Sequence, residues 1–396
     1  MSRIPGHRFL HSPGPTHIPD EVLDAMHRQP MDLADDRLDM VLDDCMAGLQ
    51  RVFKTSGVVT MFTSNGHGGW EAVIENALEV GESALVPGTG HFSENWAMQT
   101  EALGRPVVRI PWREGYPIDA NQVEEALRAD TEQKIGAVFA VHTDTAGSVT
   151  SDIAAVRAAI DAVGHRALLV VDVVASLAAA PFDMDGLGVN MAIGGSQKGL
   201  MLPPGLAFVA ADETAQKKIT ANPALRFYWN WDRRQHPLSY MKFCGTPPEH
   251  LLFGLQASLR LIEREGLDNI TARHARLAGA VHHAVQAWST AGSINFFARE
   301  PACRSVSVTT VEVTGGFDPE AIRRVAREKF QVAMAGGNGP LIGRVFRIGH
   351  LGDLNPAMIL GALGGIEAAL CVQKVPYGEG ALSSAAAWLA QTAGAD

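Results

Sequence analysis

The chain has 396 residues and a mass of 42.3 kDa, which suits one large catalytic domain with a smaller domain attached. Hydrophobic residues make up 46% and charged residues 19%, a balance typical of globular proteins rather than of disordered chains or coiled coils. The 33 Lys and Arg against 43 Asp and Glu give a net charge of −10 without a basic stretch, so nucleic acid is not expected as the main partner.

The cysteines and the apolar segments indicate in which cellular compartment the protein is expected. No CxxC spacing occurs among the four cysteines, so neither a disulfide framework nor a structural zinc site is expected; they are Cys45, Cys244, Cys303 and Cys371. The first residues lack an apolar stretch of signal-peptide length, and no apolar run approaches the roughly 18 residues of a membrane span. These features predict a soluble, cytoplasmic protein that does not associate with membranes.

The first two hundred residues alternate between helical and strand patterns. After an extended Pro- and Gly-rich segment that ends at Pro19, helical periodicity covers 20–27 and 38–53. Apolar strands are then predicted at 58–62, 83–86, 106–110, 136–141, 167–171, 191–193 and 206–210. Helices are predicted between them, for example at 70–78, 121–129 and 153–163. Because these strands are apolar throughout, we expect a mostly parallel sheet that is covered by helices on both faces.

The pattern changes near Ala221. An aromatic stretch that contains proline, 226–248, leads into helical periodicity from Leu251 to about Ala287. Strands near 305–313, 331–334 and 345–348, with helices at 319–329 and 356–371, then form a small α+β unit. We therefore predict an N-terminal extended segment (1–20), a large α/β domain (21–250), a connecting helix (251–290) and a small C-terminal α+β domain (291–396).

Two charged residues follow apolar strands, at the edge of a parallel sheet where ligands usually bind. Asp172 comes directly after four aliphatic residues, and an unpaired carboxylate there would be costly to bury. Lys198 lies 26 residues later in a Gly-rich turn, next to an apolar segment that would desolvate its amine and lower its pKa. Taken singly, Asp172 is more typical of a helix cap or structural ion pair, and Lys198 of a surface lysine in a Gly-rich loop.

A third candidate is the small-residue loop 63–71, with the sequence TSNGHGGWE, between a strand and a helix. Its small residues and the free N–H groups of the helix start favour an anion such as phosphate, although alone the loop could be only a tight turn. It is neither a P-loop nor a GxGxxG loop. An anion cradle, a buried Asp and a buried Lys on three strand ends are together what a pyridoxal phosphate enzyme needs.

A fourth candidate is Arg347, which interrupts an apolar strand in RVFRIGH, whereas Arg344 at its margin is expected to face solvent. A guanidinium held within a strand suits bidentate recognition of a carboxylate. An interdomain salt bridge is the alternative interpretation, and the motif alone leaves both open.

In this order, the motifs resemble those of class V (fold-type I) aminotransferases, and among them the serine–glyoxylate and alanine–glyoxylate group. The resemblance runs over nearly the whole chain: PGPT from Pro13, SNGHGGWE from Ser64, HTDTAG from His142, DVVAS from Asp172, GSQKG from Gly195, PPGL from Pro203, TPP from Thr246 and FRIGHLG from Phe346. It implies a large, mostly parallel seven-stranded sheet domain with a small C-terminal α+β domain, and a PLP-dependent aminotransferase.

The resemblance also implies roles for individual residues. Lys198 would form the Schiff base with pyridoxal 5′-phosphate (PLP) and carry the substrate proton, and Asp172 would pair with the pyridine nitrogen. Cofactor contacts would come from Asn65, Gly66, His67, Phe92, Thr145, Val174 and Gln197, and from Thr246 of a neighbouring subunit. Arg347 would bind the substrate carboxylate while the backbone near Gly14 closes the site. The expected partners are therefore a small amino acid, a 2-oxo acid and at least one further copy of the chain.

The chain departs from the family pattern at four places. Phe243 replaces a phosphate-binding Tyr, Ala146 a Ser or Thr, His67 a Thr, and 32–37 (DLADDR) the usual His-Arg-Ser stretch. The Lys, Asp and Arg positions are kept, so the departures bear on substrate choice.

We therefore expect transamination between a small amino acid, such as serine or alanine, and glyoxylate or another small 2-oxo acid. Aspartate–glyoxylate transamination stays open because Arg37 could reach the site. Pyridoxamine–pyruvate transamination also stays open, since Phe243 weakens the phosphate site. A cysteine desulfurase, an inactive relative and a nicotinamide-dependent dehydrogenase fit less well: no loop Cys is suitably placed, the three key residues are present and GxGxxG is absent.

Overall fold

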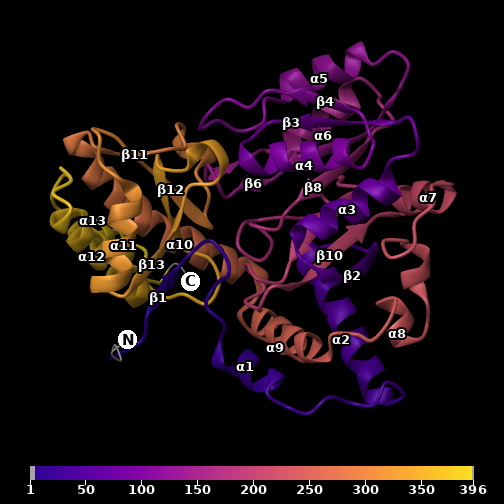
Figure 1. The fold of residues 1–396 in the computed structure, drawn as a ribbon, viewed down its shortest axis with the longest axis horizontal. Coiled ribbons are helices and arrows are strands. Elements are labelled where there is room, and N and C mark those ends of the chain that lie inside the picture. The colour runs from indigo at the N-terminus through magenta and orange to yellow at the C-terminus, as the bar shows by residue number, and fades with distance from the viewer. Residues whose placement is uncertain (1–4, 395–396) are drawn as a thin grey trace.

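A computed structural model describes residues 5–394 of the chain and divides them into a large and a small part (Figure 1). The large part is built on a seven-stranded sheet. In spatial order, its strands are β2 (Val58–Ser64), β10 (Gly205–Ala211), β9 (Met191–Gly195), β8 (Leu168–Asp172), β5 (Ile135–Val141), β3 (Ser83–Pro87) and β4 (Val107–Ile110). Only β10 runs antiparallel to both of its neighbours, so the sheet is mostly parallel, as the sequence predicts.

Helices cover both faces of this sheet because its strands are apolar on both sides. Along β5, Val138 and Ala140 belong to one buried cluster, whereas Phe139 and Val141 belong to another. The helices of the first face are α2 (Asp36–Phe53), α5 (Ala120–Ala129), α6 (Ile153–Ala162) and α9 (Glu249–Glu265). Those of the second are α3 (Gly66–Ala77), α4 (His91–Ala102) and α7 (Glu213–Ala221). The short helices α1 (Asp20–Met26) and α8 (Ser239–Lys242) lie at the margin.

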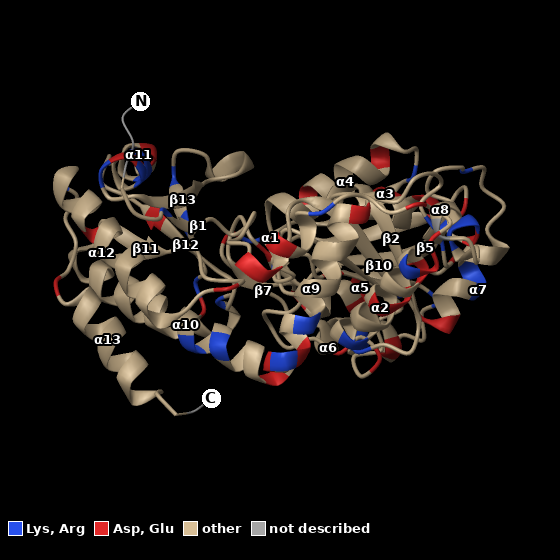
Figure 2. Ribbon diagram, turned by 90° about the horizontal axis from the view of Figure 1, so that it is seen from below, with Lys and Arg blue, Asp and Glu red and all other residues tan. Residues whose placement is uncertain are grey.

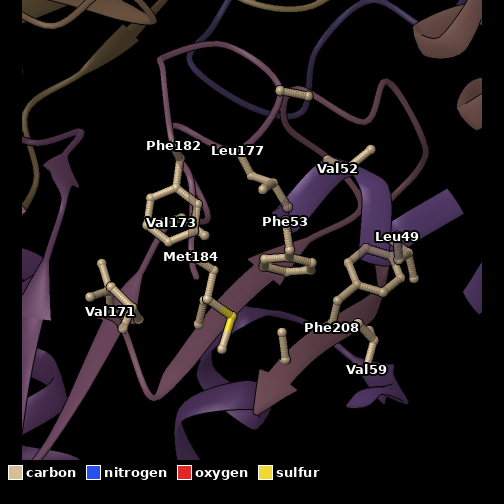
Figure 3. Close-up of a cluster of buried hydrophobic side chains, with 14 of the residues drawn as sticks. Leu49, Val52, Phe53, Val59, Val171, Val173, Leu177, Phe182, Met184 and Phe208 are labelled. Carbon is tan, nitrogen blue, oxygen red and sulfur yellow. The ribbon is translucent and has the colours of Figure 1, made fainter. Parts of the chain in front are cut away.

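The core against α2 brings that helix close to the strands that carry the site. Figure 3 shows Leu49 and Phe53 of α2 beside Phe208 of β10, with Val173 and Leu177 nearby. On β9, a Cβ added at Gly194 would lie 2.8 Å from Leu177 Cδ2 and 3.1 Å from Phe53 Cζ. Strand β9 therefore passes close to this core, and a larger residue at Gly194 would force Leu177 to shift.

The small part is a five-stranded sheet packed against helices. Its strands, in spatial order, are β1 (Phe9–His11), β13 (Val332–Gly336), β14 (Val345–Gly349), β12 (Val308–Val313) and β11 (Ile294–Phe296). Its helices are α10 (Leu267–Trp288), α11 (Pro319–Lys329), α12 (Pro356–Val372) and α13 (Ala381–Gln391). Helices α12 and α13 are almost free of charged residues, whereas the helices of the large part carry many (Figure 2).

Two segments add detail that the sequence does not carry. The N-terminal segment, expected to be extended, contains the strand β1, which pairs in parallel with β13 and ties this segment to the small part (Figure 1). The stretch 251–290, expected to be one connecting helix, is two helices, because the chain turns at Gly266 with φ +84°. That backbone conformation favours glycine and ends α9 although the apolar periodicity continues beyond it.

Within residues 5–394, none of the helices is long and apolar enough to cross a membrane.

Candidate active site

A pocket with a volume of about 280 Å³ opens where β8 and β9 end and α3 begins. The N-terminal segment around Gly14 forms another of its walls. Most of the predicted site residues line it together: Gly14, Asn65, Gly66, His67, Phe92, Thr145, Asp172, Val174, Gln197 and Lys198. The carboxyl ends of parallel strands are the usual place for a ligand in an α/β sheet.

Asp172, the last residue of β8, is a buried acid held by two hydrogen bonds. Its Oδ1 accepts from the Val174 backbone N–H at 2.7 Å, and its Oδ2 accepts from Trp70 Nε1 at 2.9 Å. Burial raises the pKa of this carboxyl to about 6, against the lowering effect of the two hydrogen bonds. A carboxylate kept in this environment is stabilised by any cation placed before it.

Lys198 follows β9 in the turn predicted from the sequence. Its Nζ donates to the carbonyl oxygen of Pro13, and its own carbonyl oxygen accepts from Thr16 Oγ1 at 3.1 Å. Burial, and to a smaller extent Arg347, lower the pKa of the ammonium to about 8 against the opposing effect of Asp172. Because its pKa lies close to neutrality, the amine is a competent nucleophile and proton carrier.

The start of α3 forms the third wall, and its geometry suits an anion. Asn65 is the N-cap, and its Oδ1 accepts from the His67 N–H at 3.1 Å, while Gly66 begins the helix. A Cβ at Gly66 would lie 3.2 Å from Val174 Cγ2, so glycine keeps this wall open. Gln197 Oε1 is buried without a hydrogen-bond partner in the described part of the chain. The free N–H groups at the start of α3 can donate to a phosphate-like ligand, whereas Gln197 Oε1 is an acceptor and would need a donor from elsewhere.

Phe92 and Thr145 are positioned by a buried carboxylate that sequence reasoning missed. Asp144 Oδ2 accepts from the Phe92 N–H at 3.0 Å, and its Oδ1 accepts from the Ala146 N–H at 2.9 Å. Thr145 lies between Asp144 and the anchored Ala146, and Phe92 faces the pocket from the first turn of α4. Asp144 thus holds the backbone N–H that follows Thr145 and that of Phe92.

Arg347 sits behind the pocket wall, in the middle of β14, and is buried. Its Nη1 donates to the Thr145 carbonyl oxygen at 3.0 Å and its Nε to the Gly336 carbonyl oxygen at 2.6 Å. Its Nη2 donates to Asn338 Oδ1 at 3.0 Å. The interdomain salt bridge left open by the sequence does not form here: in the part of the chain that is described, Arg347 contacts only neutral oxygens. Arg344 pairs with Glu114 and Glu312 near the surface.

Thr246 is the one predicted site residue that lies away from this cluster. It is exposed, follows α8 and does not line the pocket, whereas the nearby Phe243 is buried. Within a single chain, the predicted groups other than Arg347 and Thr246 therefore line one pocket, and Arg347 reaches its wall through the Thr145 carbonyl oxygen.

Two further residues of the site were not assigned from the sequence. Trp70 lay inside the motif 63–71, but only the fold reveals its hydrogen bond to Asp172. Asn338 follows β13 in a Gly-rich loop that carries no motif. A polar residue flanked by glycines near a strand end is the only signal that could have pointed to it.

Comparison with known proteins decides the family. The model of the family "Aminotransferase class-V" matches residues 8–342, well over half of the chain. The chain belongs to the class V aminotransferases. This family assignment confirms the resemblance predicted from the sequence and makes the protein an aminotransferase.

Relatives of this aminotransferase span nearly its whole length. A serine–glyoxylate aminotransferase from Methylorubrum extorquens is 39% identical over 93% of this chain and 92% of the relative. An L-aspartate–glyoxylate aminotransferase from Paracoccus denitrificans is 41% identical over 89% of this chain and 88% of the relative. The solved structure of ureidoglycine–glyoxylate aminotransferase from Bacillus subtilis has a TM-score of 0.89 and 25% identity, covering 98% of this chain and 99% of the other. The fold is thus that of the fold-type I aminotransferases.

Class V aminotransferases use PLP, and the pocket of this aminotransferase fits that cofactor. The cofactor carries a phosphate, an aromatic ring with a basic nitrogen, and an aldehyde. The pocket offers the free N–H groups at the start of α3 for the phosphate, the buried Asp172 carboxyl for the ring nitrogen and the Lys198 amine for the aldehyde.

Proposed function

We propose that this chain binds PLP and transfers an amino group between a small amino acid and glyoxylate or another small 2-oxo acid. The observation that carries the proposal is the convergence of Lys198, Asp172 and the start of α3 on one pocket, with Arg347 directly behind its Thr145 wall. PLP would supply an electron sink that stabilises negative charge at the substrate Cα.

The two charged residues of the large part divide the chemistry. Lys198 Nζ would attach the resting cofactor and then carry the proton to and from the substrate Cα, which its lowered pKa favours. Asp172, held by Val174 and Trp70, would keep the pyridine nitrogen protonated and strengthen the electron sink.

The other residues would hold the cofactor in place. Asn65, Gly66, His67 and Gln197 would surround the phosphate, since they form the wall around the start of α3. Val174 and Phe92 would contact the two ring faces, and Thr145 would hydrogen-bond the ring hydroxyl.

Arg347 would bind the carboxylate that donor and acceptor share. Among the described residues its buried guanidinium forms no ion pair, and burial lowers its pKa to about 10, so a carboxylate ligand would offset the cost of burying the charge. The backbone near Gly14 would close the site, as the contact between Lys198 and the Pro13 carbonyl oxygen supports. One such clamp favours monocarboxylates, which supports serine or alanine as the donor.

Aspartate is the second candidate donor. The similarity to an L-aspartate–glyoxylate aminotransferase favours it. The position of Arg37 argues against aspartate, because Arg37 is the residue that would have to bind the side-chain carboxylate of that substrate. It is exposed and already paired with Asp35, with 2.9 Å between Arg37 Nε and Asp35 Oδ1. Pyridoxamine as the donor is supported only by Phe243, which lacks a hydroxyl for the phosphate.

A half-reaction screen would test the proposed function. The holoenzyme is mixed with single amino acids or with pyridoxamine while the visible cofactor band is followed. Rapid loss of the band with serine or alanine, and its recovery with glyoxylate, is the expected result. A response to aspartate or pyridoxamine alone would move the assignment to that donor, and no response to any amine would reject the proposal.

We also propose a homodimer or larger assembly with shared sites, in which Thr246 would reach the phosphate of a neighbouring copy. Thr246 lies outside its own pocket, and the segment before it exposes Leu225, Phe227, Leu238 and Tyr240, which are 99%, 67%, 50% and 40% exposed. Side chains of this kind usually pack at an interface. Mixing inactive Lys198→Ala with an inactive Thr246→Ala variant should restore part of the activity, because one of the two mixed sites would be intact. A fully active monomer in sedimentation would contradict it.

A cytoplasmic location completes the proposal. The four cysteines are all unpaired, which supports a reducing compartment.

A further inference from the structure

The guanidinium of Arg347 donates to three oxygens from two segments of the chain. Its Nε donates to the Gly336 carbonyl oxygen, its Nη1 to the Thr145 carbonyl oxygen and its Nη2 to Asn338 Oδ1. The first two acceptors are backbone atoms, one within β13 and one directly after β6 (Thr143–Asp144). Asn338 is the one side chain of the three.

All three acceptors are neutral, so they orient the guanidinium without cancelling its charge. A guanidinium has five N–H groups, and three are used here, which leaves two for one bidentate carboxylate. Asp144 acts on Arg347 through its charge, but its oxygens are bound to Thr89, Phe92 and Ala146.

The loop around Asn338 is built to bring its amide to this place. A Cβ at Gly337 would lie 2.0 Å from the Leu341 carbonyl oxygen. Gly339 has φ +53°, and a Cβ there would lie 2.6 Å from His91 Nδ1. The Asn338 carbonyl oxygen also accepts from the Leu341 N–H at 3.1 Å. The loop therefore packs too tightly for side chains on either side of Asn338, which fixes its backbone close to Arg347.

We propose that Asn338 is a positioning residue that sets how strongly Arg347 binds the substrate carboxylate. The inference rests on the proposed carboxylate-binding role of Arg347 and deepens it. The neutral Asn338 amide orients the guanidinium of Arg347 without pairing with its positive charge, so that charge is free to bind the substrate carboxylate. A carboxylate in place of the amide would form an internal ion pair and occupy the charge that the substrate needs.

The inference predicts an unusual order of effects at this position. Asn338→Asp keeps the size and shape of the side chain, so a purely structural role would tolerate it better than Asn338→Leu. We expect the reverse. The KM for donor and acceptor should rise roughly tenfold in Asn338→Asp, since a charge-assisted contact is lost, and only about threefold in Asn338→Leu. In both variants kcat should change less than KM, because Asn338 acts on binding.

Steady-state kinetics of the complete reaction with the holoenzyme, with donor and acceptor varied in turn, provides the test. Asn355→Asp is the matched control: it adds the same charge to the small part at the exposed N-cap of α12, where Asp caps as well as Asn, and should leave KM unchanged. A KM for Asn338→Asp within about twofold of the parent, or a smaller effect than in Asn338→Leu, overturns the inference.

Two further variants keep the result interpretable. If Asn338→Asp does not fold, Asn338→Ser keeps a neutral acceptor and should raise KM less than Asn338→Leu; equal effects would overturn the inference. Arg347→Gln separates the proposed role of Asn338 from the proposed carboxylate-binding role of Arg347. If it raises KM while the Asn338 variants do not, only the role of Asn338 fails; if it leaves KM unchanged, the proposed clamp fails as well.

Discussion

The two ends of the site are built on opposite principles. At the large-part end, Asp172 ends β8 and Lys198 lies in the turn after β9, beside the core around Phe53 and Leu177, and these two groups of opposite charge act on each other. At the small-part end, Arg347 is buried among neutral oxygens and has no carboxylate partner within the described residues. With the proposed cofactor bound, Asp172 and Lys198 would both have partners. Arg347 would gain a carboxylate partner only while a substrate is bound.

The most damaging change should be at Lys198, since the proposed cofactor bond and the proton carrier are the same amine. Lys198→Ala should lower turnover by roughly a thousandfold or more. Lys217→Ala, which removes an exposed lysine paired with Glu213, should leave turnover unchanged. Borohydride reduction followed by peptide mapping should find the pyridoxyl label on Lys198, and a label on another lysine would reject the assignment.

At the opposite end, Arg347→Lys tests whether geometry matters beyond charge. A lysine ammonium keeps the charge but lacks the planar fork, so binding of donor and acceptor should weaken by about 2–5 kcal/mol. The loss should appear in kcat/KM for serine, alanine and glyoxylate alike. Normal kinetics with all three substrates would show that the charge alone suffices, and the contrast between the two ends would not hold.

These expectations show what the sequence could and could not reveal. The ends of β8 and β9 were predictable, because Asp172 and Lys198 follow short apolar runs and the site motifs are local. The antiparallel direction of β10 was not, since an apolar run carries no direction. The break at Gly266 was hidden because apolar periodicity continues from α9 into α10. Contacts between distant segments, such as Trp70 with Asp172 and Asn338 with Arg347, exist only once the sheets have formed.

The hydrogen bond from Trp70 to Asp172 offers a finer test of the large-part end. Trp70→Phe removes the donor and leaves one carboxylate oxygen without it, which should weaken cofactor binding by about 2 kcal/mol. Trp96→Phe is the matched control, because Trp96 stacks on Trp70 at 5.4 Å but its Nε1 is buried without a partner among the described residues. Cofactor dissociation measured by absorbance after dialysis should distinguish them, and equal losses would mean that Trp70 contributes packing alone.

The smallest expected effect concerns the stability of the small-part end in acid. Four histidines gather behind β14, and burial lowers the pKa of each: His11 and His282 to about 4, His274 to about 3, and His350 well below its ordinary value. They stay neutral in the folded chain while the unfolded chain takes up protons below pH 6.5, so they stabilise the fold above that pH and destabilise it as the pH falls towards 4.

The buried acid at the other end has the opposite sign. The pKa of Asp172 is raised to about 6, so without cofactor its burial as an anion costs stability above pH 6, and that cost disappears as the pH falls. A fall in pH should therefore reduce the stability contributed by the four histidines of the small part and remove the stability cost of the Asp172 anion in the large part. His282→Gln isolates the first effect, because His282 Nε2 has no partner in the described part of the chain. Relative to pH 8, the variant should lose about 1 kcal/mol less stability at pH 6 than the parent. Urea unfolding of the cofactor-free protein at the two pH values measures this difference, and parallel losses in parent and variant would show that His282 is not among the groups that titrate.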